Sequence, residues 1–255
     1  MTNFVLDKLY FSPVKSLSFI NTKNLIIKKD VGIKNDRILA FTRIINEEEA
    51  NDYQKNPNKR NLKFFLTLKN SPFLNKYKFQ LKDDKLTLLH LDQVIKKISI
   101  NNSDDLKTIS IELKKREKIT NYTPYLIKNL DFPFFDTMPK NSISLINVNS
   151  INDFEKKIDY KIDHERFRGN IYIKNINPWV EFEWINKIIS VNDCLFKVLK
   201  KIPRCSATSL ILNSDKVDIN LPKKLKETYG HIDMGIYLKP LNNGTINIRD
   251  QVKIS

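Results

Sequence analysis

The sequence contains only two cysteines, Cys194 and Cys205. This number excludes a disulfide-stapled scaffold, a four-cysteine zinc site and an iron–sulfur cluster held by this chain alone. Only three histidines are present, which leaves little room for a histidine-rich metal site.

Long apolar runs are also missing, since none approaches the roughly 20 residues that a membrane-spanning helix needs. The N-terminus lacks the basic head and the apolar stretch of a signal peptide. We therefore expect a cytoplasmic protein without a membrane span.

Arginine is scarce beside lysine: 8 of the 44 basic residues are arginine, and the formal net charge is +15. The lysines are spread along the whole chain instead of being gathered in one stripe. Such a general bias supports weak attraction to anions but does not identify a groove-reading surface. We therefore do not expect nucleic acid to be the partner.

Short runs rich in β-branched and aromatic residues dominate the chain and predict strands. They lie at 3–11, 24–29, 37–45, 77–81, 86–91, 94–100, 108–113, 142–148, 170–174, 194–202, 235–241 and 245–254. Apolar spacing and start or stop residues predict two short helices, at 150–158 and 221–229. We expect a mostly β (α+β) protein with few short helices. Its two abutting units would span residues 1–118, with little helix, and 119–255.

Cys205 follows Arg204 at the point where a predicted strand gives way to a polar loop. A neighbouring guanidinium favours the thiolate, which is the form that attacks or binds a soft metal. The alternative is that Cys205 is a small buried apolar residue, as lone cytosolic cysteines often are. Cys194 opens an apolar strand with no adjacent cation, so we interpret it as structural.

Other polar groups suggest anion binding. Arg166, Arg168 and Asn170 alternate along one short segment and would form a donor fork for a phosphate or a heterocycle, or else a solvated surface. Lys15 and Ser16 follow a proline turn and offer an ammonium and a hydroxyl together.

Two further segments contain candidate functional residues. Arg37 begins a predicted strand after Gly32. His231 and Asp233 have the spacing of an acid/base pair, although a structural role for His231 is favoured.

These pieces, in this order, resemble the MOSC family, named for the C-terminal domain of molybdenum-cofactor sulfurase, together with the N-terminal β-barrel domain that precedes it in many members. The motifs that carry the resemblance are Ser12-Pro-Val-Lys-Ser-Leu17, Gly32…Asp36-Arg37, Phe65…Pro72, Ser144-Leu145…Ser150-Ile151, Arg166-Phe-Arg-Gly-Asn-Ile171, Trp179…Trp184, Pro203-Arg-Cys-Ser-Ala-Thr208 and Gly230-His-Ile-Asp-Met-Gly-Ile-Tyr237. Three residues depart from the family pattern: Gly169 stands for proline, Arg249 for glycine and Lys69 for arginine.

The resemblance implies a MOSC-type β-barrel at 119–255, preceded by a β-barrel-like domain at 1–118. It also implies a protein similar to the mitochondrial amidoxime-reducing component and its bacterial relatives, with a molybdenum cofactor (molybdopterin) bound between the two units. Cys205 would ligate molybdenum and be the catalytic residue. The expected cofactor-binding residues are Lys15, Ser16, Arg37, Ser150, Arg166, Arg168, Asn170, Arg204 and Thr208.

Two functions follow from the resemblance. The first is reduction of N-hydroxylated or N-oxide small molecules, with electrons from an acidic donor such as a ferredoxin or a cytochrome b5-like protein. The second is a carrier that holds a persulfide or the cofactor without turnover of its own. We expect no iron–sulfur cluster, flavin or pyridoxal phosphate in either case. A basic nucleic-acid-binding protein would explain neither Cys205 nor the ordered motifs.

Overall fold

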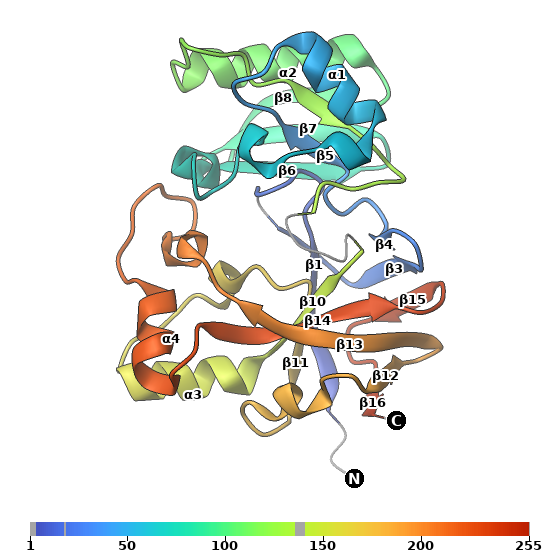
Figure 1. The fold of residues 1–255 in the computed structure, drawn as a ribbon, viewed down its shortest axis with the longest axis vertical. Coiled ribbons are helices and arrows are strands. Elements are labelled where there is room, and N and C mark those ends of the chain that lie inside the picture. Colours follow the sequence, from blue (N-terminus) through green and yellow to red (C-terminus); the bar gives the residue numbers. More distant parts are fainter. Residues whose placement is uncertain (1–3, 18, 136–140, 255) are drawn as a thin grey trace.

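The computed structural model describes residues 4–17, 19–135 and 141–254 and shows two parts that lie one above the other in Figure 1. The lower part is built around an eight-stranded sheet that curls into a half-barrel. Its order is β16 (Val252–Ile254), β12 (Ile188–Val191), β13 (Cys194–Pro203), β14 (Asp233–Pro240), β10 (Ile143–Asn147), β11 (Ile171–Lys174), β1 (Val5–Phe11) and β2 (Ile20–Thr22). The mostly β fold is therefore confirmed.

A small sheet and two helices complete the lower part. The sheet joins β15 (Gly244–Asn247), β3 (Asn24–Lys28) and β4 (Gly32–Ile33). The helices α3 (Val148–Ile158) and α4 (Leu221–Tyr229) confirm the two predicted ones. Helix α4 begins after the cap Asn220 and ends at Gly230, whose φ of 77° is the left-handed conformation that favours glycine.

The upper part holds a three-stranded sheet of β6 (Tyr77–Lys82), β7 (Lys85–His90) and β8 (Gln93–Ser99). It also contains the pair β5 (Leu39–Phe41) and β9 (Leu126–Lys128), with helices α1 (Glu47–Lys55) and α2 (Ser103–Arg116). The strands predicted at 77–81 and 86–91 are confirmed, and they pair as the antiparallel hairpin of β6 and β7.

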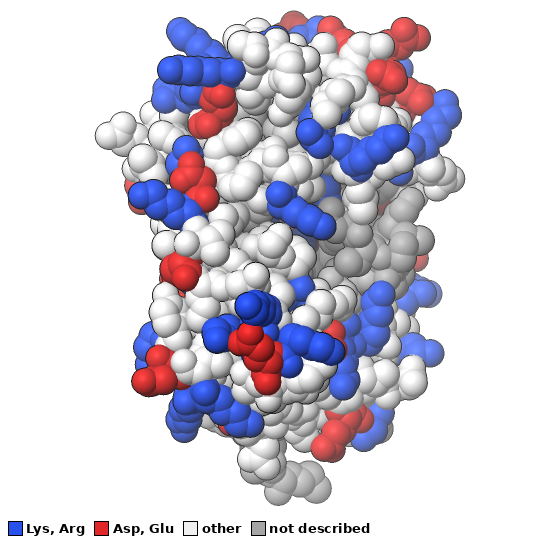
Figure 2. Space-filling view, turned by 60° about the vertical axis from the view of Figure 1, so that its left-hand side comes forward, with Lys and Arg blue, Asp and Glu red and all other residues white. Residues whose placement is uncertain are grey.

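Basic side chains are not gathered into one patch on the face seen in Figure 2. Figure 2 shows lysine and arginine side chains spread over the visible surface, with acidic side chains among them. This pattern agrees with the diffuse basic bias of the sequence.

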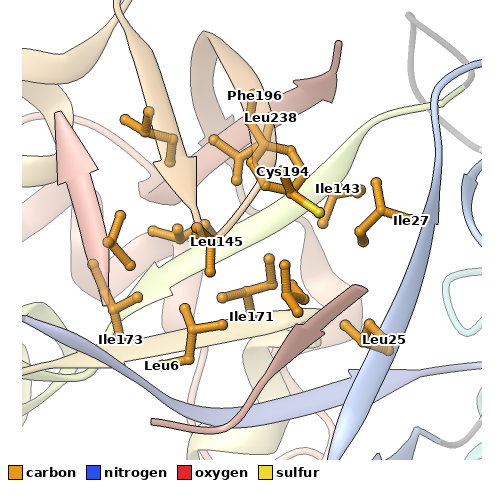
Figure 3. Packing of buried hydrophobic residues seen from close by; sticks show 14 of the residues in the cluster. Leu6, Leu25, Ile27, Ile143, Leu145, Ile171, Ile173, Cys194, Phe196 and Leu238 are labelled. Carbon is orange, nitrogen blue, oxygen red and sulfur yellow. The ribbon is translucent and has the colours of Figure 1, made fainter. Parts of the chain in front are cut away.

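The largest core fills the inside of the curled sheet and contains Cys194, which is 1% exposed. Figure 3 shows this side chain among apolar residues that include Ile27, Ile143 and Leu238. A methyl group on Gly244 would lie 2.4 Å from the Cys194 sulfur, so the sulfur occupies space that a side chain there would need. The structural interpretation of Cys194 is confirmed, and burial raises the pKa of its thiol.

Three predictions about the elements are wrong. Residues 108–113 lie in helix α2 and not in a strand, because Leu106, Ile109 and Leu113 have helical spacing and are the residues that face the core. Helix α1 was not predicted, so the first 118 residues contain more helix than expected. The run 245–254 forms two strands in different sheets, since Arg249 has a left-handed φ of 72° between them.

The division at 118/119 stays a prediction. Strand β1 pairs with β11, and β3 pairs with β15, so strands from before residue 118 complete sheets whose other members come after it. Asn3, at the start of the first predicted strand, lies outside the described residues. Among the described residues, no helix is long and apolar enough to cross a membrane.

Candidate functional site

A cavity of about 710 Å³ is lined by residues of both parts. Seven of the predicted site residues line it: Ser16, Arg37, Arg168, Asn170, Arg204, Cys205 and Thr208. They come from the loop after β1, the turn before β5, the segment between α3 and β11, and the end of β13. The fold thus brings together positions that lie up to 192 residues apart.

Cys205 stands between β13 and the short 3-10 helix η6 (Ser206–Ser209), and it is exposed. Its carbonyl oxygen accepts hydrogen bonds from the Thr208 backbone nitrogen at 3.1 Å and from Thr208 Oγ1 at 2.9 Å. The backbone of Cys205 is therefore held in place while its thiol remains accessible at the cavity wall.

Arg204 is 8% exposed and fixes the strand end that carries Cys205. Its Nε donates to the Met234 carbonyl at 2.8 Å, and its Nη1 donates to the Phe167 carbonyl at 2.7 Å. Burial lowers the pKa of this guanidinium from its ordinary value. Because its donors bind backbone carbonyls of two other segments, Arg204 positions Cys205 as well as lining the cavity.

Arg166 supports η6 from outside the cavity lining. Its guanidinium donates to the carbonyls of Thr208 at 3.0 Å and Ser209 at 2.7 Å. It also forms an ion pair with Asp218, whose carboxylate accepts at 3.0 Å and 2.7 Å. Partial burial opposes ionisation of Asp218, but hydrogen bonds from Arg166 and Tyr160 lower its pKa to about 2. The structure therefore separates Arg166 from the donor fork predicted with Arg168 and Asn170.

Asn170 joins four segments of the chain. Its Oδ1 accepts from Ser144 Oγ at 2.8 Å, and its Nδ2 donates to the Tyr10 carbonyl at 3.2 Å and to Asp36 Oδ2 at 3.5 Å. The Asn170 backbone nitrogen also donates to Ser144 Oγ at 2.9 Å. The side chain is 1% exposed, so it holds the cavity wall together from within.

Arg37 and Arg168 place two guanidinium groups on one aromatic ring. Their central carbons lie 5.6 Å and 4.7 Å from the centre of the Phe19 ring, within the range of cation–π contact. Arg37 forms an ion pair with Asp36, and Arg168 Nη2 donates to the Leu17 carbonyl at 2.8 Å. Burial raises the pKa of Asp36, although Arg37 and the Ser12 backbone nitrogen oppose the shift.

Three residues of the cavity wall have a strained backbone conformation. Ser16, Arg37 and Arg168 all line the cavity, and all have a left-handed φ, at 63°, 55° and 53°. Non-glycine residues rarely adopt this conformation, and they keep it where the surroundings enforce it. Other residues with a left-handed φ are spread over the rest of the described chain, so the conformation alone does not mark the site.

Two other predicted residues do not line the cavity. Lys15 is 2% exposed, and its Nζ donates to the Phe134 carbonyl at 3.4 Å. Ser150 lies in α3, where its hydroxyl donates to Glu181 at 2.8 Å and accepts from the Trp179 backbone nitrogen at 2.8 Å. The contacts of Ser150 therefore join α3 to the segment before β12.

Gly169 and Tyr172 explain the departure from the family's proline. The Gly169 backbone nitrogen donates to Tyr172 Oη at 3.1 Å, which a proline could not do. A Cβ on Gly169 would also lie 2.7 Å from Ile146 Cδ1. The glycine thus packs the segment that carries Asn170 closely against β10.

Several residues that line the cavity were not predicted as site residues. Leu62, Lys63, Thr67, Leu68, Lys69 and Asn70 line it from the upper part. Ser142, Ser144 and Tyr237 line it from the lower part. The motifs Phe65…Pro72, Ser144-Leu145 and Gly230…Tyr237 already contained several of these residues, so the signal was present without a role attached.

The described lining is basic. It contains five cationic side chains and no carboxylate: Arg37, Lys63, Lys69, Arg168 and Arg204. Fields of one sign inside a concave surface add together and attract the opposite charge. The cavity is therefore suited to an anionic ligand, with the Cys205 thiol as the soft donor in its wall.

The other cluster noted in the sequence lies elsewhere. His231 does not line the cavity, and its ring contacts those of Trp179, Phe182 and Tyr229. Its Nδ1 accepts from the Asp233 backbone nitrogen at 3.1 Å, and burial lowers its pKa. Within the described residues, no group of three or more histidine, cysteine or acidic side chains is placed to hold a metal ion.

The exposed thiol, the basic cavity and the curled sheet agree with a match to a family model described as MOSC domain, over residues 135–253. These residues are a MOSC domain. Some members of the MOSC family bind the molybdenum cofactor. Cys205, Arg168 and Asn170 lie inside the matched domain, whereas Ser16, Arg37 and the upper wall of the cavity precede it.

Similar chains among solved structures include YiiM and the YUAD protein. YiiM from Geobacillus stearothermophilus is 17% identical over 44% of this chain and 53% of its own, with a TM-score of 0.36. The YUAD protein from Bacillus subtilis is 11% identical over 100% of this chain and 98% of its own, with a TM-score of 0.45. The matched region thus spans about half the length of YiiM. Among curated proteins, none matches this chain.

Proposed function

We propose that this protein is a cytoplasmic oxidoreductase that binds a molybdenum cofactor in the cavity and reduces N-hydroxylated or N-oxide compounds. One observation carries the proposal: the exposed Cys205 thiol stands in the wall of a large basic cavity whose described lining has no carboxylate. The MOSC domain adds support, because some members of this family bind that cofactor.

The residues of the cavity fit such a cofactor. A volume of about 710 Å³ lies within the range of cofactor and ligand sites. A thiolate is a suitable donor for a soft metal, and arginine, serine and asparagine donors suit a phosphate and a polar heterocycle. Ser16 and Arg37 would bind the phosphate end, with Lys15 behind them. Arg168 and Asn170 would face the pterin.

When bound, the cofactor supplies a two-electron redox centre suited to oxygen-atom transfer. Cys205 would ligate the metal, and its position depends on the bonds of Arg204 and Arg166 to the neighbouring backbone. The ion pair with Asp36 fixes the Arg37 guanidinium at the cavity edge. These residues therefore preorganise the ligand donors before a cofactor arrives.

Overall, an amidoxime, two electrons and two protons would give an amidine and water, as the N–O bond breaks. The electrons would come from a separate acidic donor protein of the ferredoxin or cytochrome b5 class. A net charge of +15 supports this partner, because opposite charge speeds encounter between proteins. We propose no iron–sulfur cluster, flavin or pyridoxal phosphate in this chain.

Turnover tests the proposal. Protein from a cofactor-competent host is mixed with benzamidoxime and a chemically reduced donor, and benzamidine is measured. Wild type and Cys194→Ser should form benzamidine, and Cys205→Ala should not. Protein that contains the cofactor yet forms no benzamidine with any donor would overturn the reductase proposal.

A second candidate function is a carrier that holds a persulfide or the cofactor on Cys205. The exposure of the Cys205 thiol favours it, since a carrier must pass its cargo to another protein. Mass analysis distinguishes the two, because a carrier would show a mass increase of one sulfur atom on Cys205, or would transfer its cofactor to an acceptor enzyme without turnover.

A further inference from the structure

We propose that the substrate of this cavity is an apolar molecule with a carboxylate group, and that Lys63 and Lys69 bind this carboxylate. This inference rests on the proposed function and deepens it by naming the substrate class. Both lysines line the cavity from the upper part of the molecule, outside the MOSC domain.

The backbone that presents Lys69 is held by its own turn. The Thr67 backbone nitrogen donates to Asn70 Oδ1 at 2.8 Å, and the Ser71 nitrogen donates to the Thr67 carbonyl at 2.8 Å. Asn70 Nδ2 donates to the Phe65 carbonyl at 3.0 Å. The backbone at Lys69 is therefore set before a ligand binds, so that binding has to order only the lysine side chain.

Lys63 is held in a similar way. It lies in the 3-10 helix η2 (Leu62–Phe64), whose cap Asn61 accepts from the Lys63 backbone nitrogen at 3.2 Å. The Arg43 backbone nitrogen donates to the Phe64 carbonyl at 2.8 Å and ties this helix to the end of β5. Lys63 Nζ lies 4.6 Å from the centre of the Phe64 ring.

The two lysine charges have no carboxylate partner among the described residues, although the Lys63 ammonium lies over the Phe64 ring. Within the described residues, neither lysine forms an ion pair, whereas Arg37 pairs with Asp36. Arg204 and Arg168 bind backbone carbonyls. The cofactor phosphate, which carries about two negative charges, would be met at the other wall by Ser16 and Arg37. A second anion is what the pair Lys63 and Lys69 would neutralise.

The same wall is also apolar. Leu62 and Leu68 line it beside the lysines, and Phe135 and Phe167 line the cavity as well. Leu62 is 47% exposed, although a leucine side chain gains by leaving water. An aryl or alkyl body would cover these surfaces while its carboxylate reaches the lysines. This combination favours an aryl carboxylate that also bears the N-oxygenated group.

A matched substrate pair tests the inference. The kcat/KM of the cofactor-loaded protein is measured for benzamidoxime and for 4-carboxybenzamidoxime, at fixed low ionic strength. We expect the carboxylate to raise kcat/KM about tenfold, through KM, because the lysine contacts form equally in ground and transition states. Lys63→Met and Lys69→Met should each reduce this tenfold preference to about threefold. Lys69→Arg should retain the full preference.

Controls separate the two proposals. Lys253→Met, on the distant edge strand β16, should leave the preference unchanged. Isothermal titration with the products benzamidine and 4-carboxybenzamidine measures the same preference without turnover.

Equal kcat/KM for both substrates, with no effect of the lysine variants, would overturn the inference while the reductase proposal stands. Lysine variants that raise only the KM for the donor protein would also overturn it, by assigning this wall to protein docking. Loss of turnover for both substrates in the wild type, with the binding preference intact, would count against the reductase proposal alone.

Discussion

Arg166 and Asp218 form a doubly hydrogen-bonded ion pair, with N–O distances of 3.0 Å and 2.7 Å. The pair lies behind the turn that carries Cys205, because the same guanidinium donates to the carbonyls of Thr208 and Ser209. Arg166 is 4% exposed, so these acceptors replace the water that would otherwise stabilise its positive charge. The geometry of the candidate metal ligand thus depends on a residue that does not line the cavity.

Replacing Asp218 with asparagine should destabilise the fold by about 2 kcal/mol at neutral pH, because a buried guanidinium loses a charged acceptor. The pKa of Asp218 is about 2 in the folded protein, below its ordinary value of 3.8. The stabilisation of the fold by the ionised Asp218 carboxylate is therefore fully present above pH about 4 and is lost as the pH falls toward about 2. Urea unfolding of wild type and Asp218→Asn across this range checks it; a stability difference that stays constant down to pH 2 would contradict the account.

Two glycines with similar backbone angles should respond differently to alanine. Gly235 has a φ of 80°, and a Cβ there would lie 2.4 Å from the Leu145 carbonyl oxygen of β10. Gly230 has a φ of 77°, with nothing within 4 Å of its Cβ position. We expect Gly230→Ala to cost about 1 kcal/mol, from the left-handed backbone alone. Gly235→Ala should cost about 3 kcal/mol or more, because overpacking is added. Equal losses in thermal unfolding would show that β14 and β10 are not packed so closely.

The two cysteines should differ in their reaction with a thiol reagent. Cys205 is exposed, whereas Cys194 is 1% exposed in the core. In the protein freed of cofactor, iodoacetamide should modify Cys205 within minutes and Cys194 only at the rate of unfolding. Peptide mass mapping measures both rates, with the urea-unfolded chain as the reference. Rapid labelling of Cys194 in the folded protein would contradict the core assignment.

Asn170 can be tested with a change that preserves its shape. Asn170→Asp replaces the Nδ2 donor to Asp36 with a carboxylate oxygen, so two carboxylates would meet at this position. Asn170→Ala removes the contacts without adding a charge. We expect the aspartate variant to be the less stable of the two at pH 7, by about 1–2 kcal/mol. This gap should close as the pH falls, because burial raises the pKa of Asp36 and its carboxyl is protonated at a higher pH than an ordinary aspartate. An aspartate variant as stable as wild type at pH 7 would show that the contact with Asp36 is unimportant.

The sequence was informative where the signal is local. The hairpin at residues 77–90, the helices α3 and α4 and the strand that ends before Cys205 follow from nearby apolar patterns and caps. Helix α2 was missed because the run Thr-Ile-Ser-Ile-Glu-Leu alternates like a strand, and only the buried Leu106, Ile109 and Leu113 reveal helical spacing. The pairing of β1 with β11 could not be predicted from a single sequence, since no local signal identifies a partner so far away.

The site shows the same limit. Motif order predicted that Cys205, Arg168 and Asn170 share one site, and all three line the cavity, but it could not show which donors already have partners in the protein. Arg166 and Arg168 stand two residues apart, yet one binds Asp218 and the other lines the cavity. The wall with Lys63 and Lys69 was missed because its role depends on how the upper part of the molecule packs over the sheet.

The central claim is that Cys205 holds a molybdenum cofactor in this cavity. Native mass spectrometry, with molybdenum measured on the same sample, tests it directly in protein from a cofactor-competent host. We predict one molybdopterin mass and one molybdenum per chain for wild type and Cys194→Ser, and at least a tenfold loss of molybdenum for Cys205→Ala. A correctly folded wild type without pterin or molybdenum, or a Cys205→Ala variant that retains both in full, would contradict the account.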